Sequence, residues 1–386
     1  MNNFHYHNPT RLLFGKGEIA SITPLIPKSA KVMMIYGGGS IFKNGVHDQV
    51  KKALEGFEVI EFGGIEPNPK YETCMSVVKK IKAEKCTFLL AVGGGSVLDA
   101  TKFIALAAKY KGEDPWDFIT QKSPAPDEAL PLASIMTLPA TGSEMNASFV
   151  ISRESTQEKF GGYSELIRPL FSVIDPMTTM SLPPTQTANG IVDVFVHTME
   201  QYATCPNNGP LQDRQAEAIL STLIEEGPKA MATPNDYDVR ANLCWCSTQT
   251  LNGYISCGMP QDWASHEIGH ELTALYGIDH ARTLSIILPG VWRTFLNEKK
   301  EKLAQYGSRV LGLKGNVDEV ALEAIEKTEE FFESLGLPTR FKAYDINASD
   351  AARLVSERFT ARNKPGFGEK GLITPEIVRQ IIESRA

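Results

Sequence analysis

The side chains best suited to chemistry in this sequence are histidines and an aspartate in the central part of the chain. Asp193 and His197 are four residues apart in one apolar stretch, so on a helix they would lie one turn apart on the same face. His266 and His270 have the same spacing, and His280 follows a glycine positioned to end their helix. Imidazole nitrogens and carboxylate oxygens are common ligands of zinc and iron. We therefore predict that Asp193, His197, His266 and His280 share one divalent metal ion.

A second interpretation of the same histidines is a zinc hydrolase. The run from His266 to His270 reads H-E-x-x-H, a pattern in which both histidines bind zinc and the glutamate, here Glu267, activates water. The longer form of the pattern fails because Thr273 and Tyr276 occupy the positions of its glycine and third histidine. A metallohydrolase therefore stays as an alternative function.

Two Gly-Gly-Gly-Ser runs, at 37–40 and 93–96, each follow a short apolar segment. A strand, a glycine turn and a helix start together present backbone N–H groups and the positive end of a helix dipole to a phosphate. Tight turns also need glycine, and neither run matches G-x-G-x-x-G. A non-catalytic nucleotide sensor would keep such loops and need no metal, so it is a second alternative.

The elements that must position these groups fall into two parts. Apolar runs at 31–36, 58–62 and 86–92 alternate with helical stretches, which is the pattern of an open parallel sheet with ligands at the carboxyl ends of its strands. Further along, a 3.6-residue periodicity dominates to the end. We predict a dinucleotide-binding, Rossmann-like α/β domain over 1–182 and an all-helical, metal-binding catalytic domain over 183–386.

Composition excludes several classes of protein. With 42% hydrophobic and 22% charged residues, the chain is typical of a globular protein with a sizeable core. The net charge of -7 argues against nucleic acid as a partner, and no uncharged stretch is long enough for a membrane span. Six scattered cysteines and an N-terminus without a signal-peptide pattern favour a cytoplasmic location.

Several motifs together resemble one known family, the iron-containing, metal-dependent alcohol dehydrogenases, whose fold is dehydroquinate synthase-like. The segments that carry the resemblance are Gly93 to Lys102, Thr137 to Glu144, the Asp193 and His197 pair, and His266 to His280. The resemblance extends over nearly the whole chain, and more narrowly the sequence is similar to bacterial NADPH-dependent aldehyde reductases and butanol dehydrogenases. In one departure, Glu267 and Ile268 stand where many relatives carry small residues.

The resemblance implies NADP(H) and one divalent ion, Zn²⁺ or Fe²⁺, as cofactors, with a small aldehyde or alcohol as substrate. It implies that hydride passes reversibly between the nicotinamide C4 and the carbonyl carbon while the metal polarises the carbonyl oxygen. The residues that we expect at the nucleotide are Gly37, Gly38, Gly39, Ser40, Gly94, Gly95, Ser96, Asp99, Thr137, Thr141, Asn146, Lys159, Thr178 and Leu182. The expected catalytic side chains are His270, Asp99 and Lys159, and His270 faces substrate and nicotinamide as the last member of a proton path.

The residues after the first predicted strand fit either a plain tight turn or a site for a 2′-phosphate, and the resemblance to NADPH-using relatives favours NADPH over NADH. NAD-specific folds usually place an acidic side chain there, which would repel a 2′-phosphate. Between the strand at 31–36 and Asp48 the chain has no carboxylate, and Ser40 and Lys43 could donate to the phosphate instead.

The N-terminal segment suggests how the protein assembles. Relatives commonly pair through this part of the chain, and residues 10–14 form an apolar segment with little nearby to cover it. We therefore predict a homodimer.

Overall fold

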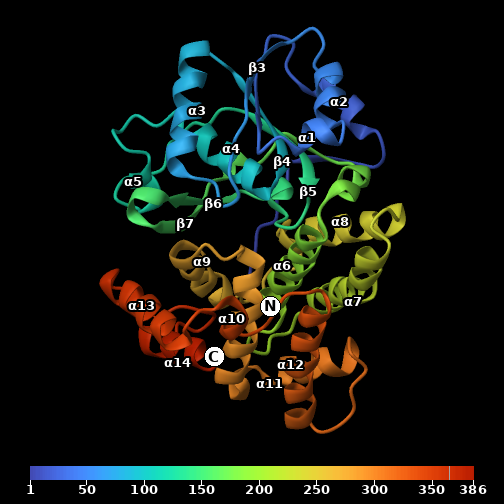
Figure 1. Ribbon diagram of the computed structural model, residues 1–386, viewed down its shortest axis with the longest axis vertical. Helices are drawn as coiled ribbons and strands as arrows, with labels where there is room; N and C mark the ends of the chain where they lie inside the picture. The colour runs from blue at the N-terminus through green and yellow to red at the C-terminus, as the bar shows by residue number, and fades with distance from the viewer. Residues whose placement is uncertain (365) are drawn as a thin grey trace. The chain divides into compact units, whose positions relative to one another are not determined.

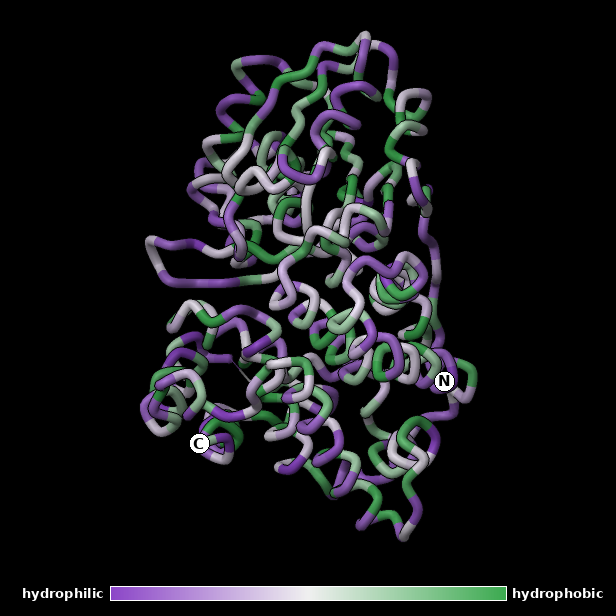
Figure 2. Tube along the Cα trace, turned by 45° about the vertical axis from the view of Figure 1, so that its right-hand side comes forward, coloured by the Kyte–Doolittle hydropathy of each residue, from purple (hydrophilic) through white to green (hydrophobic). Residues whose placement is uncertain are grey.

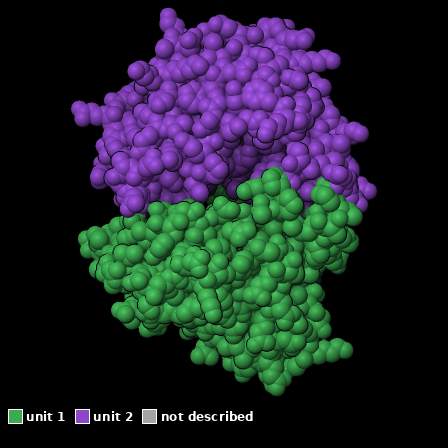
Figure 3. Space-filling model, in the orientation of Figure 1, with its two compact units in different colours: residues 1–6, 183–234, 249–386 green, residues 7–182, 235–248 purple. Residues whose placement is uncertain are grey.

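A computed structural model of the chain describes residues 1–364 and 366–386, and its elements are shown in order in Figure 1. The chain forms two compact units, coloured separately in Figure 3. The sheet unit contains residues 7–182 and 235–248, and the helical unit contains residues 1–6, 183–234 and 249–386. The chain leaves the sheet unit after residue 182, where the boundary was expected. Two segments depart from the expected division, because residues 1–6 belong to the helical unit and residues 235–248 belong to the sheet unit.

Six strands of the sheet unit form a parallel sheet in the order β1-β8-β5-β4-β2-β3. They are β1 (Arg11–Phe14), β2 (Lys31–Tyr36), β3 (Glu58–Phe62), β4 (Phe88–Gly94), β5 (Leu132–Leu138) and β8 (Phe171–Ile174). A separate antiparallel hairpin consists of β6 (Ser148–Arg153) and β7 (Glu158–Tyr163). The α-helices are α1 (Ser40–Lys43), α2 (Val46–Ala53), α3 (Tyr71–Glu84), α4 (Gly95–Ala107), α5 (Trp116–Ile119) and most of α8 (Tyr237–Leu251). The 3₁₀ helices of this unit are η1 (Glu18–Leu25), η2 (Ser143–Met145), η3 (Glu154–Thr156), η4 (Glu165–Ile167) and η5 (Pro176–Ser181). The predicted parallel sheet is confirmed.

Both faces of the sheet are buried, which explains why its strands are almost continuously apolar. Successive strand residues point to opposite faces. On β2, Val32 and Met34 belong to a core shared with α1 and α2, whereas Met33 and Ile35 belong to a core shared with α3 and α4. Parallel sheets are stable when helices cover both faces in this way.

The strand order reverses direction between β2 and β4. From β2 the chain moves to β3 on one side, and then β4, β5 and β8 continue on the other side. Both glycine runs lie at this point, because Gly37 follows β2 and Gly95 begins the helix after β4. A Cβ on Gly37 would lie 3.6 Å from Val97 Cγ2 on α4, so the two loops are neighbours. Open parallel sheets bind their ligands at such a reversal, at the carboxyl ends of the strands.

The helical unit consists of long, amphipathic helices. They are α6 (Pro184–Tyr202), α7 (Pro210–Ala232), α9 (Ala264–Tyr276), α10 (His280–Thr294), α11 (Leu296–Arg309), α12 (Val317–Ser334), α13 (Ala348–Ala361) and α14 (Pro375–Glu383), with the short 3₁₀ helix η6 (Phe341–Tyr344). Hydrophobic and hydrophilic stretches alternate along them in Figure 2, as expected for helices with one buried face. Across the described residues, no helix combines the length and apolar character needed to cross a membrane. The predicted helical second part is confirmed.

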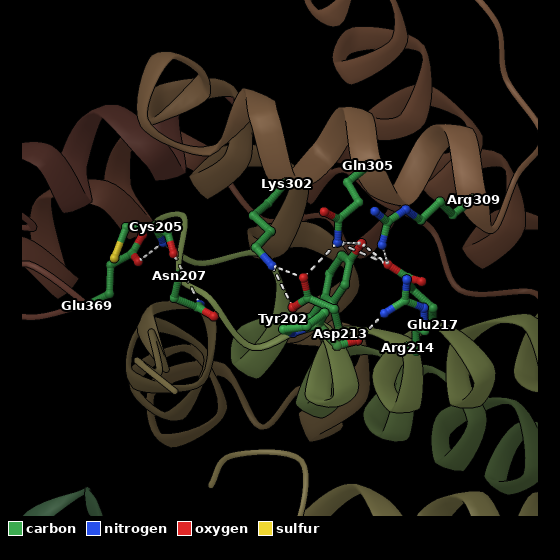
Figure 4. A network of polar contacts seen from close by, with 11 residues as sticks. Tyr202, Cys205, Asn207, Asp213, Arg214, Glu217, Lys302, Gln305, Arg309 and Glu369 are labelled. Carbon is green, nitrogen blue, oxygen red and sulfur yellow. Dashed lines mark hydrogen bonds and ion pairs between the residues drawn. The ribbon is translucent and has the colours of Figure 1, made fainter. Parts of the chain in front are cut away.

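A buried polar network holds the C-terminal end of α6 against α7 and α11 (Figure 4). Lys302 Nζ lies 2.5 and 2.6 Å from the two carboxylate oxygens of Asp213, and Gln305 donates to Asp213 at 2.9 Å. Gln305 also donates to the hydroxyl of Tyr202, which is the last residue of α6. Tyr202 in turn donates to Glu217 at 2.9 Å. The network joins the last residue of α6 to α7 and α11.

Candidate metal centre and nucleotide-binding loops

Helix α6 presents three polar side chains on one buried face. Asp193, His197 and Glu200 are spaced by four and three residues, so they lie in one row along the helix. Each is less than one-tenth exposed. Buried charged or ionisable groups need partners, and their partners come from α9 and α10.

Helices α9 and α10 bring two more histidines to Asp193. His266 lies on the first turn of α9, and Gly277 ends that helix in a left-handed conformation with φ of 68°. This turn leads to His280, the first residue of α10. Asp193 Oδ1 lies 3.8 Å from His266 Nε2 and 3.9 Å from His280 Nε2, and all three donor atoms lie within 4.8 Å of one another.

His197 adjoins this group of three donors. Its Nδ1 lies 3.5 Å from Asp193 Oδ1, and its ring stacks on that of His266 with centroids 4.4 Å apart. All four side chains predicted as metal ligands are therefore near neighbours.

The donor set fits a divalent cation. Asp193 Oδ1, His197 Nδ1 and His266 Nε2 are buried and have no hydrogen-bond partner, which is costly unless another group satisfies them. Separations of 3.5 to 3.9 Å from Asp193 Oδ1 are too long for hydrogen bonds. Two donors each about 2.1 Å from one tetrahedral ion lie roughly 3.4 Å apart. A shared ion therefore accounts for both the spacing and the unsatisfied atoms.

The pKa values of two histidines reflect this environment. Burial lowers the pKa of His197 to about 4, so its imidazole is neutral near pH 7, the form that binds metals. Burial also lowers the pKa of His266, but the Glu200 and Asp193 carboxylates raise it more, to about 9. The negative charge that attracts a proton to His266 would equally attract a metal cation.

His270 lies beside the donor group, whereas the Glu267 side chain is paired elsewhere. The ring centroid of His270 is 5.2 Å from that of His280 and 6.3 Å from that of His266. Glu267 forms an ion pair with Lys364 and is partly exposed. A zinc hydrolase would need Glu267 directed at a metal-bound water, so this arrangement does not support the hydrolase alternative.

The glycine run after β2 leaves space beside the sheet. Gly39 adopts a left-handed conformation with φ of 94° and precedes Ser40, the first residue of α1. Gly38 has no positive φ, and a Cβ at this position would meet no atom within 4 Å. A ligand group can therefore approach the backbone at Gly38.

The glycine run after β4 permits close approach of a neighbouring loop. A Cβ on Gly95 would lie 2.6 Å from Thr141 Oγ1, and one on Gly94 would lie 3.2 Å from Leu138 Cβ. Any larger residue at position 95 would push Thr141 away. The structure thus brings Thr141 and Thr137, predicted to contact the nucleotide, to the same sheet edge as the start of α4.

Asp99 is engaged inside the sheet unit. Its Oδ1 accepts a hydrogen bond from Ser143 Oγ at 2.8 Å, and its Oδ2 accepts one from the backbone N–H of Val150 at 3.0 Å. Burial raises the pKa of this carboxyl above its usual range. These contacts tie α4 to η2 and to β6. The predicted catalytic role of Asp99 stays a prediction.

Lys102, which is not among the predicted site residues, is fully buried one turn after Asp99. Its Nζ lies 2.7 to 3.0 Å from five oxygens of residues 143–148, including the side-chain oxygen of Asn146, and these oxygens share its three N–H donors. Burial lowers the pKa of Lys102 to about 7. The lysine fixes the same loop as Asp99 does, and its place in the motif from Gly93 to Lys102 was the available signal.

The remaining predicted cofactor residues lie in the sheet unit. Lys159, on β7, donates from Nζ to Asn68 Oδ1 at 2.8 Å and is buried. Thr178 Oγ1 donates to the carbonyl oxygen of Asp175 at 2.8 Å, and Leu182 directly follows η5. Their contact with a nucleotide stays a prediction.

Known proteins resemble this chain along its whole length. The family model for iron-containing alcohol dehydrogenase matches residues 9–176, and the model for the C-terminal part of the Fe-containing alcohol dehydrogenase family matches 187–385. The NADPH-dependent aldehyde reductase YqhD of Escherichia coli is 52% identical, with 100% of both chains covered. The probable NADH-dependent butanol dehydrogenase 1 of Bacillus subtilis is 44% identical, again with 100% of both chains covered.

Solved structures agree with these matches. The crystal structure of E. coli YqhD has a TM-score of 0.98 at 50% identity and covers 100% of this chain and 99% of that chain. The structure of NADH-dependent butanol dehydrogenase A from Thermotoga maritima has a TM-score of 0.95 at 34% identity, with 100% of this chain and 99% of that chain covered. The predicted class of enzyme, a metal-dependent alcohol dehydrogenase or aldehyde reductase, is confirmed. The chain therefore belongs to the iron-containing alcohol dehydrogenase family.

Proposed function

We propose that this chain catalyses reversible hydride transfer between NADP(H) and a small aldehyde or alcohol, with Asp193, His197, His266 and His280 holding a divalent ion. The observation that carries the proposal is that three buried donor atoms without a hydrogen-bond partner, Asp193 Oδ1, His197 Nδ1 and His266 Nε2, lie together. Further support comes from the similarity to proteins named as an NADPH-dependent aldehyde reductase and a butanol dehydrogenase.

The four ligands suit a Lewis acid. When bound, Zn²⁺ or Fe²⁺ supplies positive charge that polarises a carbonyl oxygen and stabilises the alkoxide. One carboxylate and three neutral imidazoles cancel a single charge of such an ion, so a net positive charge is left for the substrate. The three histidines and Asp193 would thus hold the ion and determine the net charge of the site.

The sheet unit would hold the nucleotide. When bound, NADPH supplies the hydride. Gly94, Gly95 and Ser96 stand where β4 meets α4, and there the backbone N–H groups of the helix start can bind a pyrophosphate. Gly37 to Ser40, after β2, would receive the adenosine ribose and its 2′-phosphate.

His270 would hold and move a proton at the substrate. The ring of His270 is beside that of His280, so it is close to the predicted ligands without belonging to the tight donor group. Imidazole titrates near neutral pH, which suits a group that donates a proton in one direction and accepts it in the other.

Absorbance at the reduced-nicotinamide band tests the proposed reaction. We expect NADPH to be consumed when short aldehydes are added, activity to disappear with a chelator, and Zn²⁺ or Fe²⁺ to restore it. NADPH binding without turnover under all these conditions would instead support a nucleotide sensor. Metal-dependent peptide cleavage without NADPH oxidation would support the hydrolase.

We also propose that the protein is a homodimer, paired through the edge of the sheet at β1. Strand β1 lies at that edge, and Phe14 on β1 packs against Trp245 with ring centroids 5.7 Å apart. Both rings are at least one-third exposed, and an uncovered edge strand invites pairing. Sedimentation at micromolar concentration is expected to give twice the chain mass.

A pair of variants sharpens this prediction. Phe14→Asp should shift the protein toward monomer, because it places a charge on the apolar edge. Leu322→Asp, which introduces the same charge at an exposed apolar position of α12, should leave the dimer intact. A wild-type protein that sediments only as a monomer would contradict the proposal.

A cytoplasmic location is the last part of the proposal. None of the six cysteines forms a disulfide, and those at 74, 86, 244, 246 and 257 are buried. Reduced thiols are usual in a reducing compartment, so their state supports this location.

A further inference from the structure

Glu200 is buried directly behind one of the predicted metal ligands. It lies one turn beyond His197 on α6 and is 3% exposed. Its Oε2 is hydrogen-bonded to His266 Nδ1, and its Oε1 accepts from the backbone N–H of Ser265 at 2.5 Å. Its backbone carbonyl accepts from the N–H of Asp262 at 2.9 Å. One residue of α6 therefore contacts two residues on the first turn of α9 and one residue just before it.

The contact with Glu200 determines which nitrogen of His266 carries a proton. An ionised carboxylate can only accept hydrogen bonds, so His266 Nδ1 must be the donor. In the neutral imidazole the lone pair is then on Nε2. His266 Nε2 is the atom that faces Asp193 Oδ1 at 3.8 Å and has no hydrogen-bond partner. Glu200 thus keeps one proton on Nδ1, so the proton that His266 must lose to act as a metal ligand is the one on Nε2.

We infer that Glu200 is a positioning residue of the metal centre, which holds His266 in the Nδ1-protonated tautomer with Nε2 directed at the ion. The inference rests on the proposed metal site and assigns a role to a residue outside its ligand set. Such a carboxylate both orients the ring and makes the ligand more basic, so it strengthens metal binding.

Glu200→Gln separates this role from a merely structural one. The glutamine keeps the size of the side chain but offers one acceptor oxygen in place of two. The N–H of Ser265 cannot change, so the oxygen is expected to remain with it while the amide NH₂ turns to His266. The imidazole must then accept at Nδ1 and carry its proton on Nε2, which blocks the lone pair. A purely structural contact at the start of α9 would survive this substitution.

The test is Zn²⁺ affinity, measured by competition with a chromophoric chelator on the purified full-length protein. We expect Glu200→Gln to bind Zn²⁺ about 10-fold to 100-fold more weakly than wild type. The absorption spectrum of the Co²⁺-loaded variant should also shift, because the ligand field at the ion changes. Thermal unfolding of the metal-free proteins shows whether the variant is folded.

Two further variants complete the design. Glu217→Gln makes the same chemical change at a buried carboxylate of α7, whose partners are Tyr202, Gln305 and Arg309 (Figure 4), and it should bind Zn²⁺ as wild type does. His266→Ala should lose tight binding. A folded Glu200→Gln protein with wild-type affinity and an unchanged Co²⁺ spectrum would overturn the inference. If His266→Ala itself bound Zn²⁺ normally, the proposed metal site would fail instead.

Discussion

Metal-free protein, with activity about 1,000-fold below wild type or lower, is the expected result of His197→Ala or His266→Ala. Both imidazoles adjoin Asp193 Oδ1, and removal of one ligand from four leaves an ion weakly held. Polarisation of the carbonyl oxygen contributes several kcal/mol, and each 1.36 kcal/mol is a factor of ten in rate, so loss of the ion should cost about three orders of magnitude.

His270→Ala should behave differently. The ring of His270 lies 6.3 Å from that of His266, outside the three-donor group, so the variant should keep the ion and lose activity through the proton path. Elemental analysis of each purified variant decides this, with His7→Ala, at an exposed histidine of the N-terminal segment, as the control that keeps both metal and activity. If His270→Ala alone emptied the site, the H-E-x-x-H assignment would replace ours.

Gly38→Asp is expected to lower kcat/KM for NADPH by about 30-fold to 1,000-fold and to affect NADH far less. A carboxylate after β2 would stand against the 2′-phosphate, at a cost of about 2 to 4 kcal/mol. The structure makes the substitution informative, because Gly38 has an ordinary φ and a Cβ there meets no atom within 4 Å. A fall in NADPH activity would therefore arise from charge and not from a strained fold.

The matched control is Gly38→Asn, which has nearly the same shape without the charge. Steady-state kinetics with both nucleotides should show little change in the NADPH to NADH ratio for Asn and a large change for Asp. The comparison is informative because some relatives are named NADPH-dependent and others NADH-dependent. A wild-type preference for NADH, or an unchanged ratio in Gly38→Asp, would show that Gly37 to Ser40 do not bind the adenosine ribose.

Local patterns in the sequence were sufficient to predict much of the sheet. The apolar runs 31–36 and 58–62 coincide with β2 and β3, because a buried parallel strand is apolar throughout and glycine marks its end. The apolar run 86–92 begins and ends two residues earlier than β4, because this strand continues into its own glycine turn. Hairpin β6–β7 was not predicted, because its residues alternate weakly and pair with each other rather than with the main sheet.

The candidate metal site was predictable where helical spacing brings residues together. Asp193 and His197 are neighbours through one turn of α6, and Gly277 marks the turn that leads to His280. Glu200 and Lys102 were missed because their partners are distant in the chain: His266 lies 66 residues from Glu200. No periodicity within a single segment reports such a contact.

The order of synthesis differs from the order of the compact units, because α8 is made after two helices of the helical unit yet packs mainly in the sheet unit. Cys244 on α8 belongs to the same core as α3 and α4, and Thr248 Oγ1 donates to the buried Glu144 carboxylate at 2.7 Å. A nascent chain released only as far as residue 182 lacks both groups and leaves that carboxylate without its hydroxyl partner. Domains generally fold in the order in which they are synthesised. The sheet unit, however, is complete only when about residue 248 has left the ribosome. A proteolytic cut after residue 182 would therefore yield a fragment whose core lacks the residues of α8.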